Sequence, residues 1–356
     1  MTRSGSARRT RQRNKGKSSR RLELPLVADL PVPAYRLPKL VLAERRGSLL
    51  RPNPLSDFVD DDVLSLNHVS GCAMQCAFCY ARAYPRYAGD AVLTLYAGAA
   101  EQVRRELTQR PTLPRAVYLC PSTDPFPPLM EVQRETAGIV EVLAQFRVES
   151  WLMTRGFIRP SIVDHLQPHA DLIQVTFPFM TADEKLRRIL EPLAAPTRMR
   201  LRQARELLRR GFQVQASLEP LVPGLTDSRE QMVLLLDALK ASGINSVSAA
   251  YLFVRPGIQQ NVEKQWGPLG LAEPILDRYV DGPILPMGRI AAARHLPRGD
   301  RQRGYALLMA LAAERDMTVH VSALTNPDFS APPSPSIRHD RPLRQMELGQ
   351  GKPWTD

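Results

Sequence analysis

The sequence predicts an α/β protein built from parallel β/α units. Two observations carry this prediction. Short apolar runs that fit buried strands alternate with longer segments of helical periodicity between residues 63 and 253. The segments between successive runs are long enough for right-handed crossover connections. Six such units form either an open doubly wound sheet or a partial barrel, and in both architectures ligands bind at the carboxyl ends of the strands.

The predicted elements follow in chain order. Residues 22–60 are rich in proline, which rules out a long helix, so we expect an irregular lead-in with one apolar run at 40–42. Strands are expected at 63–69, 116–120, 148–153, 172–177, 214–218 and 247–253. Helices are expected at 93–107, 131–146, 160–166, 182–190, 196–210 and 227–241. Thr226 or Asp227 is the expected N-cap of the last of these helices.

The pattern weakens after residue 254. Residues 255–299 contain many prolines and glycines and are expected to cross the mouth of the barrel. A helix at 301–315 and a strand at 318–324 follow. The expected organisation is a basic tail, a lead-in, a core, a C-terminal extension that closes the barrel, and a loose proline-containing tail: 1–21, 22–60, 61–260, 261–330 and 331–356.

The formal charge of +12 is unevenly distributed along the 356 residues. Residues 1–21 hold nine Lys or Arg and no acid, which leaves +3 for the remainder. Such a tail is expected to be a disordered, solvated arm, with salt-sensitive contact to nucleic-acid phosphates as its functional interpretation. No stretch has the apolar length of a membrane helix or a signal peptide, so a cytoplasmic location is expected, with no membrane partner.

Three of the four cysteines lie in one short stretch, Cys72, Cys76 and Cys79, with the spacing C-x3-C-x2-C. Clustered thiolates select iron–sulfur, zinc or copper(I). Three thiolates on one loop can hold three corners of an iron–sulfur cube and leave the fourth iron without a protein ligand. The loop follows the first predicted strand, so fold and chemistry point to the same edge of the sheet.

A zinc site is the main structural alternative, because His68 lies four residues before Cys72 and could complete one histidine and three cysteines. Zinc ligands usually come as two separated pairs, and no second pair follows in the sequence. A disulfide is disfavoured, because three clustered cysteines and the distant Cys120 form no framework.

Other candidate residues follow later strands. Ser122, Thr123 and Asp124 could orient a polar ligand, or could cap the turn before the next helix. Arg155 could pair with a carboxylate, or could be an ordinary solvated arginine. Thr176 by itself fits a strand-forming residue. Glu191 with Arg198 or Arg200 is expected to form an ion pair that fastens a turn between two helices.

These segments together resemble the spore photoproduct lyase-related branch of the radical S-adenosylmethionine (SAM) superfamily. The similar segments are 71–84, 122–126, 153–155, 191–192 with 200–201, and 220–227, within about residues 60–260. The resemblance implies a partial (β/α)6 TIM-like barrel, a [4Fe–4S] cluster on Cys72, Cys76 and Cys79, and SAM on the open iron. It also implies that the Phe78 backbone meets the adenine, that Ser122, Thr123 and Asp124 hold the methionyl or ribose groups, and that Arg155 and Thr176 lie nearby.

The lyase uses a cysteine just before a Thr/Ser-Asp pair as hydrogen donor. Here Ser122 occupies that place and Cys120 lies two positions earlier, so Cys120 is a candidate donor whose alternative is a small buried residue closing a strand.

The resemblance implies a radical SAM enzyme, of the lyase or transferase class, that cleaves SAM to a 5′-deoxyadenosyl radical for hydrogen abstraction from a substrate, with an electron donor of flavodoxin or ferredoxin type. The alternative function is a non-catalytic nucleic-acid-binding protein with a structural zinc or iron–sulfur site. An enzyme that receives DNA or RNA through residues 1–21 is a hybrid of the two.

Overall fold

The computed structural model describes residues 23–52, 62–83, 87, 89–287, 291–321 and 325–329, and all structural statements concern these residues. Outside them lie the predicted tails at 1–21 and 331–356 in full. Parts of the predicted lead-in at 22–60 and of the predicted strand at 318–324 also lie outside them. Within the described residues, the strands form an eight-stranded sheet, a three-stranded sheet and a two-stranded hairpin.

The large sheet has the order β13-β10-β9-β8-β7-β6-β3-β2. Its strands are β2 (Arg51–Pro52), β3 (Val63–Leu66), β6 (Ala116–Leu119), β7 (Glu149–Met153), β8 (Ile173–Pro178), β9 (Gln213–Leu221), β10 (Ser246–Tyr251) and β13 (Thr318–Val321). All neighbours pair in parallel except β2, which is antiparallel to β3. The sheet is open, with β2 at one edge and β13 at the other. The predicted succession of parallel units is confirmed.

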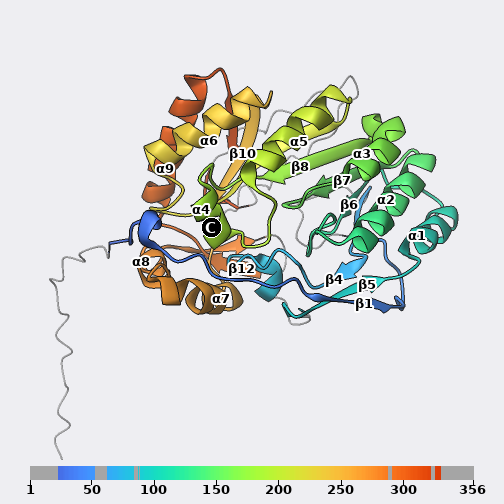
Figure 1. The fold of residues 1–356 in the computed structure, drawn as a ribbon, viewed down its shortest axis with the longest axis horizontal. Coiled ribbons are helices and arrows are strands. Elements are labelled where there is room, and N and C mark those ends of the chain that lie inside the picture. The colour runs from blue at the N-terminus through green and yellow to red at the C-terminus, as the bar shows by residue number, and fades with distance from the viewer. Residues whose placement is uncertain are drawn as a thin grey trace, which may run out of the picture.

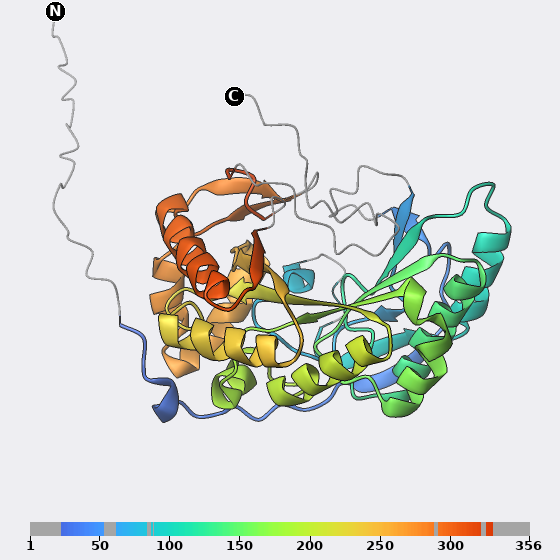
Figure 2. The ribbon, with the colours of Figure 1, turned by 90° about the horizontal axis from the view of Figure 1, so that it is seen from above.

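Helices cover the outer face of this sheet, as Figures 1 and 2 show. They are α1 (Ala99–Thr108), α2 (Met130–Gln145), α3 (Pro160–Leu166), α5 (Thr197–Arg209), α6 (Arg229–Ala241) and α9 (Arg298–Ala313). The outward residues of the strands are apolar and buried, among them Val117, Leu152 and Val175. They form one core cluster with the inner faces of the helices, which is the packing that parallel β/α units require.

The first helix was predicted too long. Residues 92–96 form a strand, β5 (Val92–Tyr96), and only α1 after Gly98 is helical. The residues of β5 alternate between half-buried and buried, which is strand periodicity. Gly98 has a φ of +71°, a left-handed conformation that separates the two elements. The prediction counted the apolar residues of both elements as one helical stripe and was therefore wrong over this segment.

A three-stranded sheet was also missed. The apolar run of the lead-in is β1 (Lys39–Ala43), which pairs in parallel with β5, and β5 pairs antiparallel with β4 (Val69–Ser70). The predicted strand 63–69 is thus divided between two sheets, with β3 in the large one and β4 in the small one. This small sheet leads directly into the cysteine loop.

The remaining elements lie after the strands or in the C-terminal part. Short 3-10 helices are η1 (Val27–Asp29), η2 (Tyr80–Ala83), η3 (Gln167–Leu172) and η4 (Gly267–Leu269). The others are α4 (Glu184–Leu190), α7 (Pro256–Trp266), α8 (Ala272–Asp277), β11 (Ile284–Met287) and β12 (Ala291–Arg294). Helix α7 packs against η2. Ser228, rather than Thr226 or Asp227, is the N-cap of α6, because its side chain accepts from the Gln231 backbone amide.

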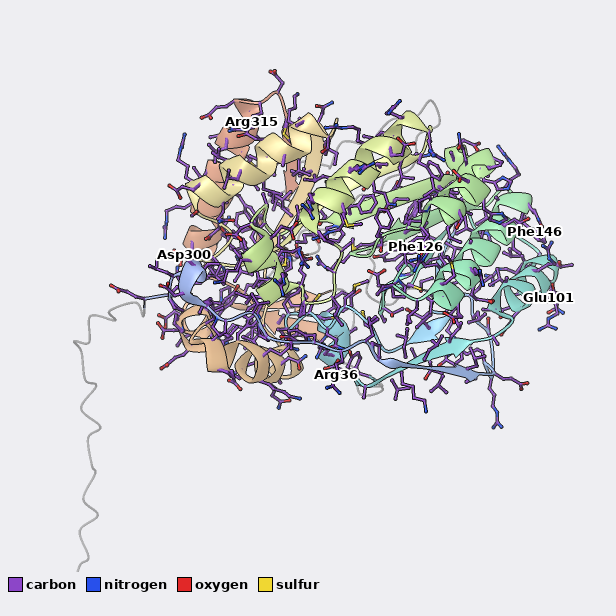
Figure 3. All side chains as sticks on the ribbon, in the orientation of Figure 1. Arg36, Glu101, Phe126, Phe146, Asp300 and Arg315 are labelled. Atoms are coloured by element: carbon purple, nitrogen blue, oxygen red, sulfur yellow. The ribbon has the colours of Figure 1, made fainter. Side chains whose placement is uncertain are left out.

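Residues 23–38 run along one side of the molecule, between the α8 region and β1 (Figure 1). Arg36 lies on this stretch at the lower edge in Figure 3, and its carbonyl accepts a 2.9 Å hydrogen bond from Gln75 Nε2 in the cysteine loop. The lead-in is therefore attached to the loop. No helix in the described part of the chain has the length and apolar character needed to cross a membrane.

Candidate functional site

The cysteine loop begins at a glycine that no other residue can replace without strain. Gly71 follows β4 with a φ of +85°, and a Cβ there would lie 2.6 Å from the carbonyl oxygen of Val92 on β5. Two residues of the loop then bond across its final turn, since the Cys79 amide donates to the Cys76 carbonyl at 3.2 Å. All three cysteines lie on the nine residues from Gly71 to the end of this turn.

The three thiols share one environment. Cys76 is buried, and Cys72 and Cys79 are half-buried. Burial raises the pKa of Cys76 to about 12 against the opposing pull of Arg155. Burial also raises the pKa of Cys72, and the neighbouring sulfurs of Cys79 and Cys76 raise it further. No three His, Cys, Asp or Glu side chains of the described residues approach closely enough to share one metal ion.

His68 is engaged elsewhere. Its Nδ1 lies 3.4 Å from Cys120 Sγ and its Nε2 lies 2.9 Å from Thr136 Oγ1 on α2. The ring is completely buried, and burial lowers its pKa to about 4. With both ring nitrogens in contact with these two side chains, His68 offers no nitrogen as the fourth ligand of a zinc site. The zinc alternative therefore loses its proposed histidine.

Cys120 closes β6 as a buried residue. It is 3% exposed and has a φ of +59°. Burial raises the pKa of its thiol, so the sulfur is protonated. Its contact with His68 joins the carboxyl ends of β3 and β6. The structure thus shows the small buried residue of the alternative interpretation, and leaves hydrogen donation by Cys120 as a prediction.

The loop after β6 joins the cysteine loop to β7. Asp124 Oδ1 accepts from the Phe126 amide at 2.9 Å and from Thr154 Oγ1 at 2.7 Å, and its Oδ2 accepts from the Arg155 amide at 2.7 Å. Thr123 Oγ1 donates to the Gly71 carbonyl. Both oxygens of Asp124 are thus used to fix the turn, which favours the capping interpretation for this residue. Phe126, which Figure 3 labels, is fully buried.

Ser122 and Thr176 lie near the carboxyl ends of β6 and β8, and their contacts do not assign them to a ligand. The Ser122 amide donates to Asn67 Oδ1 at 3.1 Å, and its side chain is half-buried. Thr176, on β8, is half-buried and lies beside Met153 of β7 in the strand register. Both therefore lie at the carboxyl-end side of the sheet, as predicted for residues close to a ligand.

Arg155 follows β7 and is not a solvated arginine. Its side chain is 16% exposed and forms an ion pair with the fully buried Glu191. Its Nη2 donates to the Glu219 carbonyl at 2.8 Å, and its guanidinium lies 5.2 Å from the centre of the Phe78 ring. The predicted pair of Glu191 with Arg200 is confirmed at 2.9 Å. Sequence reasoning missed that the same carboxylate also binds Arg155, 36 residues away.

Gly156 permits this approach, since a Cβ there would lie 1.8 Å from the Phe126 carbonyl oxygen. Any side chain at this position would separate the loops after β6 and β7. The contact between them is therefore fixed by the backbone as well as by Asp124.

The inner face of the sheet is polar. Partly exposed residues of the central strands on this face include Tyr118, Met153, Thr176, Gln215, Glu219, Ser246 and Ser248. Burial raises the pKa of the Glu219 carboxyl, against the opposing charge of Arg155. The strand prediction for 214–218 did not identify this surface, although Gln213, Gln215, Ser217 and Glu219 alternate there with apolar residues. That alternation is the signal that could have found it.

The fold has been observed before. A variant of spore photoproduct lyase superposes with a TM-score of 0.61 at 15% identity, over 80% of this chain and 82% of that one. The lyase complexed with dinucleoside spore photoproduct gives a TM-score of 0.60 at 15% identity, with the same coverage. The predicted TIM-like partial barrel is thereby confirmed.

Sequence comparison points the same way. The radical SAM Nα-GlyT isomerase of Pseudomonas phage M6 is 25% identical over 231 residues, 63% of this chain and 46% of that protein. The chain is similar to the radical SAM enzymes related to spore photoproduct lyase. This agrees with the predicted resemblance and with the prediction of an enzyme. An uncharacterised protein of Mycobacterium tuberculosis is 26% identical over 237 residues, 62% of this chain and 68% of that protein. No family model matches the chain.

The chain spans about half the length of the phage radical SAM isomerase and about two thirds of the mycobacterial protein. The comparisons therefore show a likeness over part of each chain, and the substrates and partners of these relatives are not carried over to this protein.

Replacing Glu191 tests the buried ion pairs of the site. Burial alone would raise the pKa of Glu191, but the charges of Arg200 and Arg155 outweigh it and hold the pKa below the usual 4.5. Because the pKa of Glu191 is lower in the folded than in the unfolded protein, its ionised carboxylate stabilises the fold above pH 4.5. This stabilisation is lost as the pH falls below 4.5 through the pKa of the folded protein. We expect Glu191→Gln to lower the free energy of unfolding by about 3–5 kcal/mol at pH 7, measured by urea denaturation, and the difference from wild type to narrow below pH 4.5.

Glu184→Gln is the matched control, because Glu184 pairs with Arg187 on the same helix but is 39% exposed. Glu184→Gln should lower the free energy of unfolding by less than about 1 kcal/mol. An equally small effect of Glu191→Gln, or one that does not change with pH, would contradict this assignment.

Proposed function

We propose that the chain is a radical SAM enzyme that holds a [4Fe–4S] cluster on Cys72, Cys76 and Cys79 and reductively cleaves SAM to a 5′-deoxyadenosyl radical. The observation that carries the proposal is the cysteine loop itself, which lies against the loops after β6 and β7 through Thr123, Arg155 and Phe78. A loop of three thiols at the carboxyl ends of parallel strands is a ligand position of this fold class.

The donor set fits such a cluster. Each iron of a cubane cluster takes one thiolate, so three thiolates need not converge on one ion, as they would around zinc. With His68 engaged by Cys120 and Thr136, the loop supplies three sulfurs without an adjacent histidine. When bound, the cluster would supply the electron that breaks the sulfonium bond of SAM, received from a donor of flavodoxin or ferredoxin type.

The chain's own residues orient the reactants. Burial and the arginines beside the sulfurs provide a dry, positively charged surrounding, and Arg155 is held in place by Glu191. The Phe78 backbone would contact the adenine. Ser122, Thr123 and Asp124 would hold the methionyl or ribose groups, and Thr176 would lie nearby; the hydroxyls of Ser122 and Thr176 are the candidate direct contacts.

The substrate would lie against the polar inner face. Tyr118, Gln215, Glu219 and Ser248 offer hydroxyl, amide and carboxyl groups there. Hydrogen-bonding groups that are partly exposed on an otherwise buried sheet suit a polar substrate rather than an aliphatic one. Cys120 is the candidate hydrogen donor, and a cytoplasmic location is part of the same proposal.

Cluster formation is tested with Cys72→Ala. After anaerobic reconstitution with iron and sulfide, the wild-type protein should be brown, carry iron and release 5′-deoxyadenosine from SAM when dithionite is added. The variant should lose at least 90% of that release, roughly the loss of more than 1.4 kcal/mol of transition-state stabilisation. Cys120→Ala, which removes the cysteine outside the loop, is the matched control and should retain the iron.

A full cluster and wild-type 5′-deoxyadenosine release in Cys72→Ala would show the assignment to be wrong. Colourless, zinc-loaded wild-type protein would favour the non-catalytic alternative instead.

A nucleic-acid substrate is a second candidate for the same enzyme. The nine basic residues in 1–21 supply a charged segment, and a solved neighbour of the same fold holds a dinucleoside photoproduct. Each phosphate contact steepens the dependence of binding on salt, because bound counterions are released.

Deletion of residues 1–21 tests this candidate. We expect the truncated protein to bind DNA or RNA at least tenfold more weakly at low salt, a change of about 1.4 kcal/mol, with a shallower salt dependence. Fluorescence anisotropy with a labelled oligonucleotide at several salt concentrations measures both. Unchanged affinity and slope would count against delivery of nucleic acid by this segment.

A further inference from the structure

Arg82 is the third residue after Cys79. It belongs to η2, the 3-10 turn that follows Cys79, and its amide donates to the Cys79 carbonyl at 3.2 Å. This hydrogen bond forms the turn directly after the last loop cysteine, and Arg82 is the basic residue on that turn.

The guanidinium of Arg82 is held inside the protein. Its side chain is 4% exposed, and Nη1 pairs with Asp90 Oδ2 at 2.7 Å. Nη1 also lies 3.3 Å from Asn261 Oδ1 on α7, and the guanidinium carbon lies 5.7 Å from the centre of the Tyr87 ring. These contacts fix the cation at a position where its charge acts on Cys76 and Cys79.

One donor of this buried cation is unused. Nη2 of Arg82 is buried and has no hydrogen-bond partner in the part of the chain that the structure describes. A buried donor on a charged group that lacks an acceptor is strongly unfavourable, so such a group normally meets an acceptor in the functional state. The acceptors that the sulfur loop would gain with its cluster are the ligand thiolates and inorganic sulfides.

We infer that Arg82 donates a hydrogen bond from Nη2 to a sulfur of the cluster on Cys72, Cys76 and Cys79 and thereby raises the reduction potential of that cluster. The inference rests on the proposed function. Reduction adds one negative charge, and a hydrogen-bond donor and a fixed cation in a region of low dielectric stabilise the reduced form more than the oxidised form. Arg82 is thus a positioning and tuning residue, which needs no contact with substrate.

The test is a reduction potential rather than an activity. Full-length protein, reconstituted anaerobically with iron and sulfide, is titrated with dithionite while the reduced cluster is followed by electron paramagnetic resonance (EPR), and its iron content is measured in parallel. We expect Arg82→Gln to bind iron but to have a reduction equilibrium constant about tenfold smaller, a downward shift of about 59 mV for a one-electron couple. Arg82→Lys keeps the charge without the second nitrogen and should fall between the two.

Asp90→Asn separates electrostatics from a structural effect. It removes the ion-pair partner of Arg82 and one negative charge, so the potential should move upward, opposite to Arg82→Gln. The inference would be overturned by a wild-type reduction potential in Arg82→Gln or in Arg82→Lys. A downward shift of the potential in both Arg82→Gln and Asp90→Asn would overturn it as well. Wild-type protein that takes up no iron would overturn the proposed function, and the inference with it.

Discussion

The buried carboxylate of Glu191 is the interaction on which the arrangement of the site depends. It pairs with Arg200 of α5 and with Arg155 after β7. The backbone of the turn that begins at Glu191 also contacts the cysteine loop and the loop after β7. The Leu193 amide donates to the Met74 carbonyl at 3.4 Å, and the Ala195 amide donates to the Arg155 carbonyl at 2.8 Å. A buried charge of this kind requires both partners, since removal of either leaves an uncompensated ion. The cysteine loop, the strand end and the helix connection are thus held as one unit.

Hydrogen bonds from short side chains complete that unit. Asp124 fastens the loop after β6 to Thr154 and Arg155, and Thr123 fastens it to Gly71. Because Gly71 and Gly156 allow close backbone approach, these loops meet without intervening side chains. Side chains that look like ligand contacts in the sequence therefore serve first to place the sulfurs and the Arg155 cation. The proposed chemistry depends on that placement, since an iron left open by the protein is useful only where a ligand can reach it.

The sequence predicts the parallel strands of the large sheet well because most of them are short apolar runs followed by a helix with its own periodicity, whereas the two-residue edge strand β2 was missed. It fails where two elements are adjacent without a break in hydrophobicity, as in β5 and α1, and where a strand pairs outside the main sheet, as in β1. Cysteine spacing predicts the candidate cluster ligands, and the pair of Glu191 with Arg200 is local enough to be visible. Three features depend on tertiary packing instead: the pair of Glu191 with Arg155, the contacts of His68 with Cys120 and Thr136, and the burial of the Arg82 side chain. Such contacts between residues far apart in the chain have no periodic signature.

The central claim is that three sulfurs hold a cluster with one iron open to a sulfonium compound. The most direct test is the EPR spectrum of the reduced, reconstituted protein before and after addition of SAM. If SAM binds to the open iron, the g-values of the cluster's EPR signal should change when SAM is added. They should not change when adenosine, which lacks the methionyl group, is added. Identical spectra with and without saturating SAM, in protein that carries a complete cluster, would contradict the account.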